Sequence, residues 1–208
     1  MPAHPQDAPP PQRNLRVLGV DPAVAGATGY GIIDLEGSRP KLVRFGALKL
    51  PVRATFASRL REIHQLISQL VEEFAPDAVA VESVFTALNM KTALRLAEMR
   101  GVVLLAAAQA QIPAHSYSPR EIKASVSGFG AASKQQMQQM VGSVLGLTEN
   151  PEPSDAADAL AVALCHAHVS RARERFLTAT VGPRRISMRI STAVTPSARA
   201  ARAGTPSI

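Results

Sequence analysis

The sequence predicts a mixed α/β fold, with one five-stranded sheet that begins antiparallel, becomes parallel and is flanked by helices. Three apolar runs near the N-terminus are joined by short turns, which is typical of an antiparallel meander. Two later apolar runs are separated by a long helical segment, and parallel strands need such a crossover. The chain has 208 residues, 46% of them hydrophobic, which is enough for one core. We therefore expect one α/β domain with extensions at both ends.

The first three strands are expected at residues 15–20, 30–35 and 42–50, where short apolar runs alternate with turn signals. The first run ends at Asp21-Pro22, a common turn starter, and a loop with Gly26 and Gly29 follows. A polar turn over residues 36–40 separates the second and third strands. These short connections predict antiparallel pairing.

The hydrophobic period becomes helical after the third strand. Apolar residues follow helical spacing at Phe56, Leu60, Ile63, Ile67, Leu70, Val71 and Phe74. This helix should end before Pro76. A fourth strand is expected at 77–82, a long helix at about 88–111 and a fifth strand at 113–117. The last two strands should therefore run parallel to each other.

The remainder of the domain is predicted to be helical. Ser118-Pro119-Arg120-Glu121 combines a capping box with proline at the first helical position, and Gly128-Phe129-Gly130 interrupts the helix. Ser133-Lys134-Gln135-Gln136 is a second capping box, which starts another helix. A final helix is expected from about Asp155 to Arg171.

Charge and composition divide the chain into three parts. Residues 1–13 form a proline-rich leader, which we expect to be disordered. Residues 14–170 are expected to form the folded domain, whose basic and acidic residues balance. Residues 171–208 hold eight arginines and one acid, and so carry the whole net charge of +7. We expect this tail to be solvated and disordered, although its arginines can still attract polyanions.

Other sequence features restrict the setting of the protein. The only cysteine is Cys165, so no intrachain disulfide can form and a reducing compartment is indicated. No apolar run reaches the ~18 residues that a membrane span needs. We therefore expect a cytoplasmic protein that does not insert into a membrane.

Four acidic residues occupy positions that predict a common site. Asp21 and Glu82 each end an apolar strand, and Asp155 and Asp158 lie three apart at the start of the final helix. Taken singly, each has an ordinary structural explanation as a turn starter, a strand end or a helix cap. Taken together, they lie where open α/β sheets collect their chemistry, beyond the carboxyl ends of the strands. We expect the four side chains to converge.

Convergence of four carboxylates predicts a divalent metal site. Neighbouring carboxylates repel each other and have raised pKa values unless a cation neutralises them. Oxygen ligands without a cysteine or histidine cage favour Mg²⁺ or Mn²⁺ over zinc. Two such ions, roughly 3.5–4 Å apart, can support hydrolysis of a phosphodiester. The acids therefore indicate a metal-dependent enzyme that acts on nucleic acid.

Several motifs resemble the RuvC Holliday junction resolvases of bacteria. They are Leu18-Gly19-Val20-Asp21-Pro22, Val81-Glu82-Ser83-Val84-Phe85, Ala93-Leu94-Arg95-Leu96 with Arg100-Gly101, and Asp155-Ala156-Ala157-Asp158-Ala159-Leu160-Ala161. The resemblance runs from about Leu15 to His168 in the family's order and spacing. The leader and the arginine tail lie outside it.

The resemblance implies a ribonuclease H-like fold and a homodimer whose interface includes the helix at 88–111. It implies an endonuclease that uses Mg²⁺ or Mn²⁺, with two ions per subunit, to nick four-way DNA junctions symmetrically. The family's catalytic and metal-binding acids fall on Asp21, Glu82, Asp155 and Asp158, and Asp21 would bridge both ions. A partnership with branch-migration helicase proteins of the RuvA and RuvB type is also implied.

Candidate DNA-binding residues surround the predicted site. They are Phe85, Asn89, Lys91, Arg95, Lys123 and Lys134. On the residues alone, Phe85 could either stack on an unpaired base or belong to the core, and the lysines could be ordinary surface residues. The resemblance favours stacking by Phe85 and phosphate contacts by Lys123 and Lys134.

Three other functions are compatible with parts of the sequence. A related resolvase-like nuclease that processes ribosomal RNA would share the fold. The segment from Gly19 to Gly29 is faintly similar to the phosphate loop of actin-like sugar kinases, but the chain has no room for their second lobe. A non-catalytic DNA-binding module would not need the charge of Asp21.

Overall fold

The computed structural model describes residues 14–24, 26–84 and 89–180. In this part of the chain, five strands form one mixed sheet in the order β3-β2-β1-β4-β5, so the predicted mixed α/β fold is confirmed. The strands are β1 (Leu15–Asp21), β2 (Ala27–Glu36), β3 (Arg39–Lys49), β4 (Ala78–Glu82) and β5 (Ala114–Tyr117). The helices are α1 (Phe56–Phe74), α2 (Met90–Gln109), α3 (Pro119–Ser127), α4 (Lys134–Leu145) and α5 (Ser154–Thr180).

Strand β1 is the centre of the sheet and changes its direction of pairing. It pairs antiparallel with β2, where Asp21 lies opposite Gly29, and parallel with β4, where Val20 lies opposite Val81. Strand β5 pairs parallel with β4. The carboxyl ends of β1, β4 and β5 therefore meet at one edge of the sheet.

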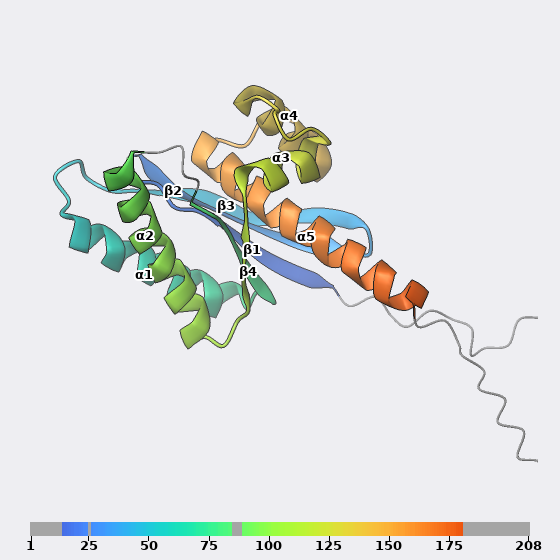
Figure 1. Ribbon diagram of the computed structural model, residues 1–208, viewed down its shortest axis with the longest axis horizontal. Helices are drawn as coiled ribbons and strands as arrows, with labels where there is room; N and C mark the ends of the chain where they lie inside the picture. Colours follow the sequence, from blue (N-terminus) through green and yellow to red (C-terminus); the bar gives the residue numbers. More distant parts are fainter. Residues whose placement is uncertain (1–13, 25, 85–88, 181–208) are drawn as a thin grey trace, which may run out of the picture.

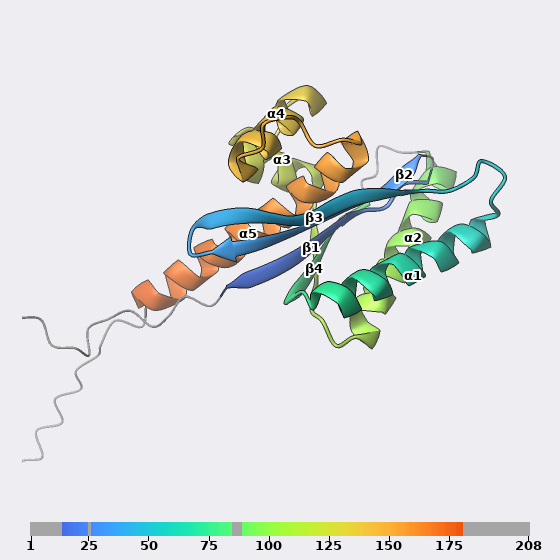
Figure 2. The same cartoon turned by 180° about the vertical axis from the view of Figure 1, so that it is seen from behind.

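Helices cover both faces of the sheet (Figures 1 and 2). The pair α1 and α2 lies on one face, and α5 crosses the other, with α3 and α4 beside its N-terminal half. Successive side chains of β1 enter opposite cores: Val17 packs on the α5 side, and Leu18 packs on the side of α1 and α2. This alternation is the period of two that a strand between two layers requires. No helix in the described residues has the length and apolarity needed to cross a membrane.

Helix α5 touches the sheet without an intervening layer of side chains at two glycines. A Cβ atom at Gly19 would overlap the carbonyl oxygen of Ala159, and one at Gly29 would overlap that of Asp155. Because Asp21 pairs with Gly29, the first turn of α5 lies only one strand away from the end of β1. The sheet and the start of α5 are thus joined directly at the predicted site.

Three elements extend beyond their predicted ends by three residues or more. Strand β3 begins at Arg39 instead of residue 42, and Glu36 pairs with Arg39, so the turn between β2 and β3 is shorter than the predicted 36–40. Strand β2 begins at Ala27 instead of residue 30, since Gly29 belongs to the ladder and serves close packing instead of a loop. Helix α5 extends through Thr180, nine residues beyond the predicted end. Arginine and alanine favour helix, and an ion pair at 3.6 Å joins Arg171 to Glu174 within this extension.

A buried polar cluster surrounds His166 of α5, where this helix contacts β5. The Tyr117 hydroxyl is 2.7 Å from its Nδ1 atom, the Ser170 hydroxyl is 3.2 Å from its Nε2 atom, and the His115 ring lies 4.4 Å from its ring. Burial is the main reason that the pKa of His166 falls to about 4, and the charges of His115 and Arg173 add to the effect. The folded protein therefore holds this histidine neutral.

This cluster should make stability depend on pH. Between about pH 6.5 and 4 the unfolded chain protonates His166 and the folded chain does not, so stability should fall as the pH falls through this range. We expect a loss of about 3 kcal/mol at pH 4 from this group. Urea unfolding at pH 7 and pH 4.5 would measure it. The loss should shrink in His166→Gln and persist in His64→Gln, whose imidazole is on the surface; equal losses in both variants would contradict the assignment.

Candidate active site

The carboxyl ends of β1 and β4 bring two predicted acids together. Asp21 is the last residue of β1 and Glu82 the last of β4, and the two strands are parallel neighbours. Both side chains line a cavity of about 330 Å³. The remaining lining residues are Pro119, Ile122, Lys123, Lys134, Met137, Asp158, Ala161 and Val162. The cavity thus has an acidic floor, an apolar wall and two lysines.

Helix α5 supplies the other two acids. It begins at Ser154, so Asp155 lies in its first turn and Asp158 three residues later. Asp158 lines the cavity. Asp155 is not among the described lining residues, but its charge acts on Asp21. Three of the four acids therefore line one cavity, and the fourth, Asp155, is near enough for its charge to act on Asp21 and Lys134.

Electrostatics single out Asp21 among the acids. Burial, and then the charges of Glu82, Asp158 and Asp155, raise its pKa well above the usual value, and only Lys134 opposes the rise. The pKa of Glu82 is also raised, first by burial and then by Asp158, while a hydrogen bond with Asp21 and the charge of Lys123 oppose this. Burial and mutual repulsion therefore raise the free energy of the ionised carboxylates, and a bound cation would lower it.

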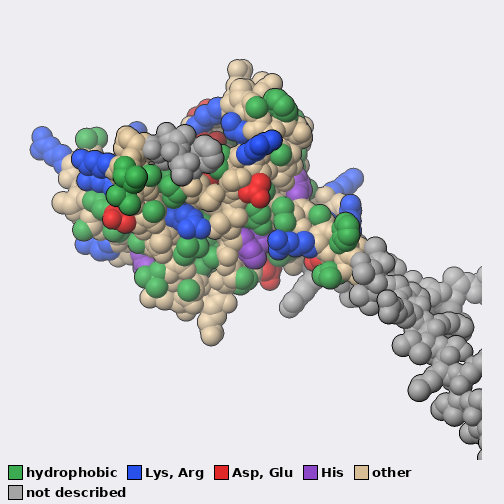
Figure 3. Space-filling model, in the orientation of Figure 1, with side chains coloured by type: hydrophobic (Ala, Val, Ile, Leu, Met, Phe, Trp, Pro, Cys, Tyr) green, Lys and Arg blue, Asp and Glu red, His purple; other side chains and the backbone are tan. Residues whose placement is uncertain are grey.

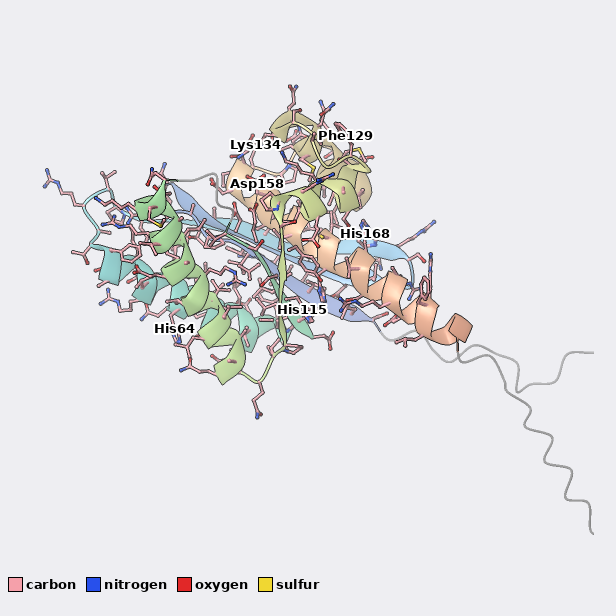
Figure 4. The ribbon with its side chains drawn as sticks, viewed as in Figure 1. His64, His115, Phe129, Lys134, Asp158 and His168 are labelled. Carbon is pink, nitrogen blue, oxygen red and sulfur yellow. The ribbon has the colours of Figure 1, made fainter. Side chains whose placement is uncertain are left out.

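Two lysines face these acids from α3 and α4. The Lys134 ammonium donates a hydrogen bond of 2.8 Å to the Oδ2 atom of Asp158 (Figure 4). This hydrogen bond is the main reason that the pKa of Lys134 is raised. Ser133 caps α4 immediately before Lys134, and the capping box of Ser118 fixes the start of α3, which carries Lys123. Both predicted capping boxes are confirmed, and they position the two cations at the cavity.

The donor set suits a hard divalent cation. All four acids offer carboxylate oxygens, and the pKa of Asp21 is raised first by burial and then by the charges of the other three acids. In the described residues, however, no three His, Cys, Asp or Glu side chains are arranged closely enough to hold an ion. Carboxylates repel each other, and Lys134 directly pairs with Asp158. The type and the charge of these ligands therefore suit a divalent cation. The acidic side chains would have to rotate toward one another to coordinate it.

The other predicted DNA-binding residues lie around α2, apart from Phe85, which is outside the described residues. Asn89 caps α2 by accepting a hydrogen bond of 2.9 Å from the Thr92 amide. Lys91 is exposed in the first turn. The Arg95 guanidinium lies 5.1 Å from the centre of the Phe56 ring. Asn89 and Arg95 therefore have contacts within the protein, which the sequence did not indicate.

One basic residue near the cavity escaped the sequence prediction. Arg120 lies three residues before Lys123 on α3, so both side chains extend from the same face of that helix. This spacing of three residues in the sequence could have indicated that Arg120 accompanies Lys123. The apolar wall around Ile122 and Met137 was also missed, because helical periodicity alone does not distinguish a core residue from a cavity wall.

Comparison with known proteins gives consistent matches. The family model "Crossover junction endodeoxyribonuclease RuvC" matches residues 17–166. A protein of that name from Syntrophomonas wolfei is 46% identical over 157 residues, 76% of this chain and 91% of its own. The RuvC structure from Thermus thermophilus has a TM-score of 0.70 at 34% identity, covering 76% of this chain and 97% of that one. RuvC of T. thermophilus in complex with a Holliday junction substrate has a TM-score of 0.68 at 32% identity, covering 76% and 96%.

The matched region contains most of β1, the whole of β2 to β5 and the four acids, and the structural matches confirm the ribonuclease H-like fold. The arginine tail lies outside it. The family model covers most of the chain, and the identity to curated relatives is high over three quarters of its length. The chain therefore belongs to the RuvC family of crossover junction endodeoxyribonucleases.

Proposed function

We propose that this protein is a DNA endonuclease that resolves four-way (Holliday) junctions by hydrolysing phosphodiester bonds. The observation that carries the proposal is Asp21, whose pKa is raised by burial and then by three neighbouring acids, in a cavity that is also lined by two lysines. Such an arrangement suits a cation and a phosphate together. Membership of the RuvC family supports the junction as the substrate. Resolution of junctions would serve recombination and repair of DNA.

Nucleases of the ribonuclease H-like type generally need a divalent metal, and we propose Mg²⁺ or Mn²⁺, with two ions per subunit. Asp21, Glu82, Asp155 and Asp158 would hold them. When bound, the ions supply Lewis-acid stabilisation of the charge that develops at the phosphate. The chain's own contribution is to bury Asp21 and keep the four carboxylates within reach, on the rigid ends of β1, β4 and α5.

The two lysines would bind the phosphate backbone of the substrate. The Lys134 ammonium is already oriented toward the cavity by Asp158, and Lys123 lines the same cavity. When a cation neutralises Asp158, Lys134 can transfer its hydrogen bond to a phosphate oxygen. Phe85, Asn89, Lys91 and Arg95 remain proposed DNA contacts, beyond the end of β4 and along the start of α2.

A homodimer would allow two strands to be nicked symmetrically. Helix α2 supports this proposal, because Leu94 and Leu105 are large apolar residues exposed on it. They are eleven residues apart and so lie on one face of the helix, which a second copy of α2 could cover. Met90 extends the apolar surface at the start of the helix.

The setting of the domain is also proposed. Residues 14–170 would form the nuclease domain, preceded by the proline-rich leader at 1–13 and followed by the basic segment 171–208, which begins within α5 and whose arginines would attract DNA. The protein would act in the cytoplasm together with branch-migration proteins of the RuvA and RuvB type. Size-exclusion chromatography with light scattering, on the purified proteins with junction DNA, would detect such a complex. Separate elution of the components would argue against it.

The central test compares substrates. Purified full-length protein should cleave a mobile four-way junction when Mg²⁺ or Mn²⁺ is present, and should leave matched duplex DNA and structured RNA largely uncut. Chelation with EDTA should stop cleavage. The same preparation should have about twice the subunit mass of 22.0 kDa in light scattering. Equal cleavage of junction and duplex, or cleavage in EDTA, would refute the proposal, and preferential cleavage of RNA would favour an RNA-processing nuclease.

A further inference from the structure

A second cavity, of about 580 Å³, adjoins the active-site cavity. The two share Pro119 and Lys123 in their linings. Arg120, Phe129, Gly130 and Ala131 are the main further residues of the second cavity. A strand whose phosphate occupies the first cavity would therefore continue into or past the second.

Phe129 presents an aromatic ring at this cavity. Its side chain is 64% exposed, although phenylalanine is usually buried. The loop that carries it is fixed by hydrogen bonds: the Ser127 hydroxyl donates to the Lys123 carbonyl at 2.8 Å, and the Phe129 amide donates to the Ser127 hydroxyl at 3.3 Å. The buried Ala132 anchors the far side of the loop. The exposed ring is thus carried by a hydrogen-bonded loop between α3 and α4, and Figure 4 labels it together with Lys134 and Asp158 of the neighbouring active-site cavity.

Two cations line the same cavity as Phe129. The stem of Arg120 packs against Gly130, where a Cβ atom would come within 2.9 Å of the Arg120 Cγ atom. Glycine at this position therefore allows the Arg120 stem to lie close to the loop. Glu121 does not line this cavity, and its carboxylate accepts two hydrogen bonds of 2.7 Å from Ser118, which does. No acid is among the described residues of this lining.

The cavity thus combines an exposed aromatic face with positive charge, next to the proposed site of hydrolysis. Aromatic rings stack on bases, and arginine and lysine bind phosphates. Figure 3 shows Lys and Arg side chains spread over this face of the molecule, its upper part included. Bases in an intact duplex are already stacked on each other, so such a ring gains most from a base that has left its stack. The chemistry matches a nucleotide, and specifically an unpaired one.

We propose that this second cavity is a DNA subsite for an unstacked nucleotide next to the scissile phosphate, with the base on Phe129 and the phosphate on Arg120 and Lys123. The inference rests on the proposed junction endonuclease and extends it, because the subsite would help the protein to select strands that depart from regular duplex. It adds Phe129 and Arg120 to the DNA-binding residues.

The test uses the full-length protein and junctions with 2-aminopurine at successive positions around the cleavage point. Wild type should quench or shift the fluorescence at one or two positions, and Phe129→Ala should abolish this effect. The same change should weaken junction binding roughly tenfold. Duplex binding should be unchanged. Phe129→Tyr should behave as wild type, and Arg120→Gln should weaken junction binding while the fluorescence signature remains.

Val52→Ala is the control, since Val52 is another strongly exposed apolar residue and lies in the connection between β3 and α1, away from the proposed DNA contacts. It should leave binding and fluorescence unchanged. A Phe129→Ala variant with an unaltered melting curve and wild-type binding would overturn the subsite, as would an equal loss of junction and duplex binding. If wild type bound the probes with a signal that depends on Phe129 but cut no junction, the proposed function would fail while the subsite stood.

Discussion

Asp21→Asn should abolish junction cleavage while junction binding persists or tightens. Asparagine keeps the shape of the side chain but removes the charge at the centre of the acidic cluster. Metal assistance lowers a reaction barrier by several kcal/mol, so we expect a fall of about 10³-fold or more in the rate of cleavage. Binding should be retained because the variant loses a negative charge that faces the phosphates of DNA. Single-turnover cleavage and gel-shift binding of the same junction would measure the two effects.

The control for this variant is Glu62→Gln, which removes an acid on α1 that pairs with its neighbour Arg61. It should cleave at the wild-type rate. Unchanged cleavage in Asp21→Asn would instead support a non-catalytic DNA-binding module. Loss of both binding and cleavage would point to misfolding, which the melting temperature would reveal.

Stability provides an independent readout of the same variant. Burial and three neighbouring acids raise the pKa of Asp21. A carboxyl with a raised folded pKa loses stability as the pH rises from its unfolded pKa through its folded pKa. At neutral pH in EDTA, Asp21→Asn should therefore melt at a higher temperature than wild type, and the difference should shrink in acid.

Gly29→Ala should disrupt both stability and catalysis. The added methyl group would overlap the backbone carbonyl of Asp155 and force α5 away from β2. Overpacking typically costs about 1–3 kcal/mol and occasionally more, and backbone atoms cannot move aside as a side chain can. Because Asp155 and Asp158 move with α5, cleavage should fall further than the folded fraction does. Urea unfolding and cleavage normalised to folded protein would separate the two losses.

Gly142→Ala is the matched control for this prediction. Gly142 lies in α4, where a Cβ atom would meet its nearest neighbour, in Asn150, at an ordinary 3.5 Å. Alanine favours helix over glycine by about 1 kcal/mol, so this variant should be as stable as wild type or more so. If Gly29→Ala were equally well tolerated, the close approach of α5 would not be what positions the acids.

The direction of strand pairing was predictable from sequence wherever the length of the connection between two strands determines it. The long helix between the fourth and fifth strands required parallel pairing of β4 and β5, and short turns required the meander of β1, β2 and β3. The start of β2 was not predictable, because Gly29 is typical of a loop until the position of α5 is known. Its true role depends on a contact between residues 126 positions apart in the chain.

The acids were predictable for the same reason as the strands that carry them. Asp21 and Glu82 end adjacent parallel strands, so their proximity follows from topology. The bond from Lys134 to Asp158 and the ring of Phe56 beneath Arg95 depend on how helices pack, and sequence periodicity does not reveal this. Phe129 was visible only as part of a break between two helices, and its exposure required the structure.

The direct contact of α5 with the sheet has a consequence for redesign of this protein. At Gly19 and Gly29 the backbone of α5 packs directly against the backbone of the sheet. The distance between helix and sheet is therefore set there by backbone atoms, whose dimensions do not depend on side-chain identity. The aliphatic residues elsewhere in the two cores can therefore be exchanged for others of similar total volume while the acids keep their spacing. A library that randomises the core should hold these two glycines fixed, and can vary most of the other buried positions.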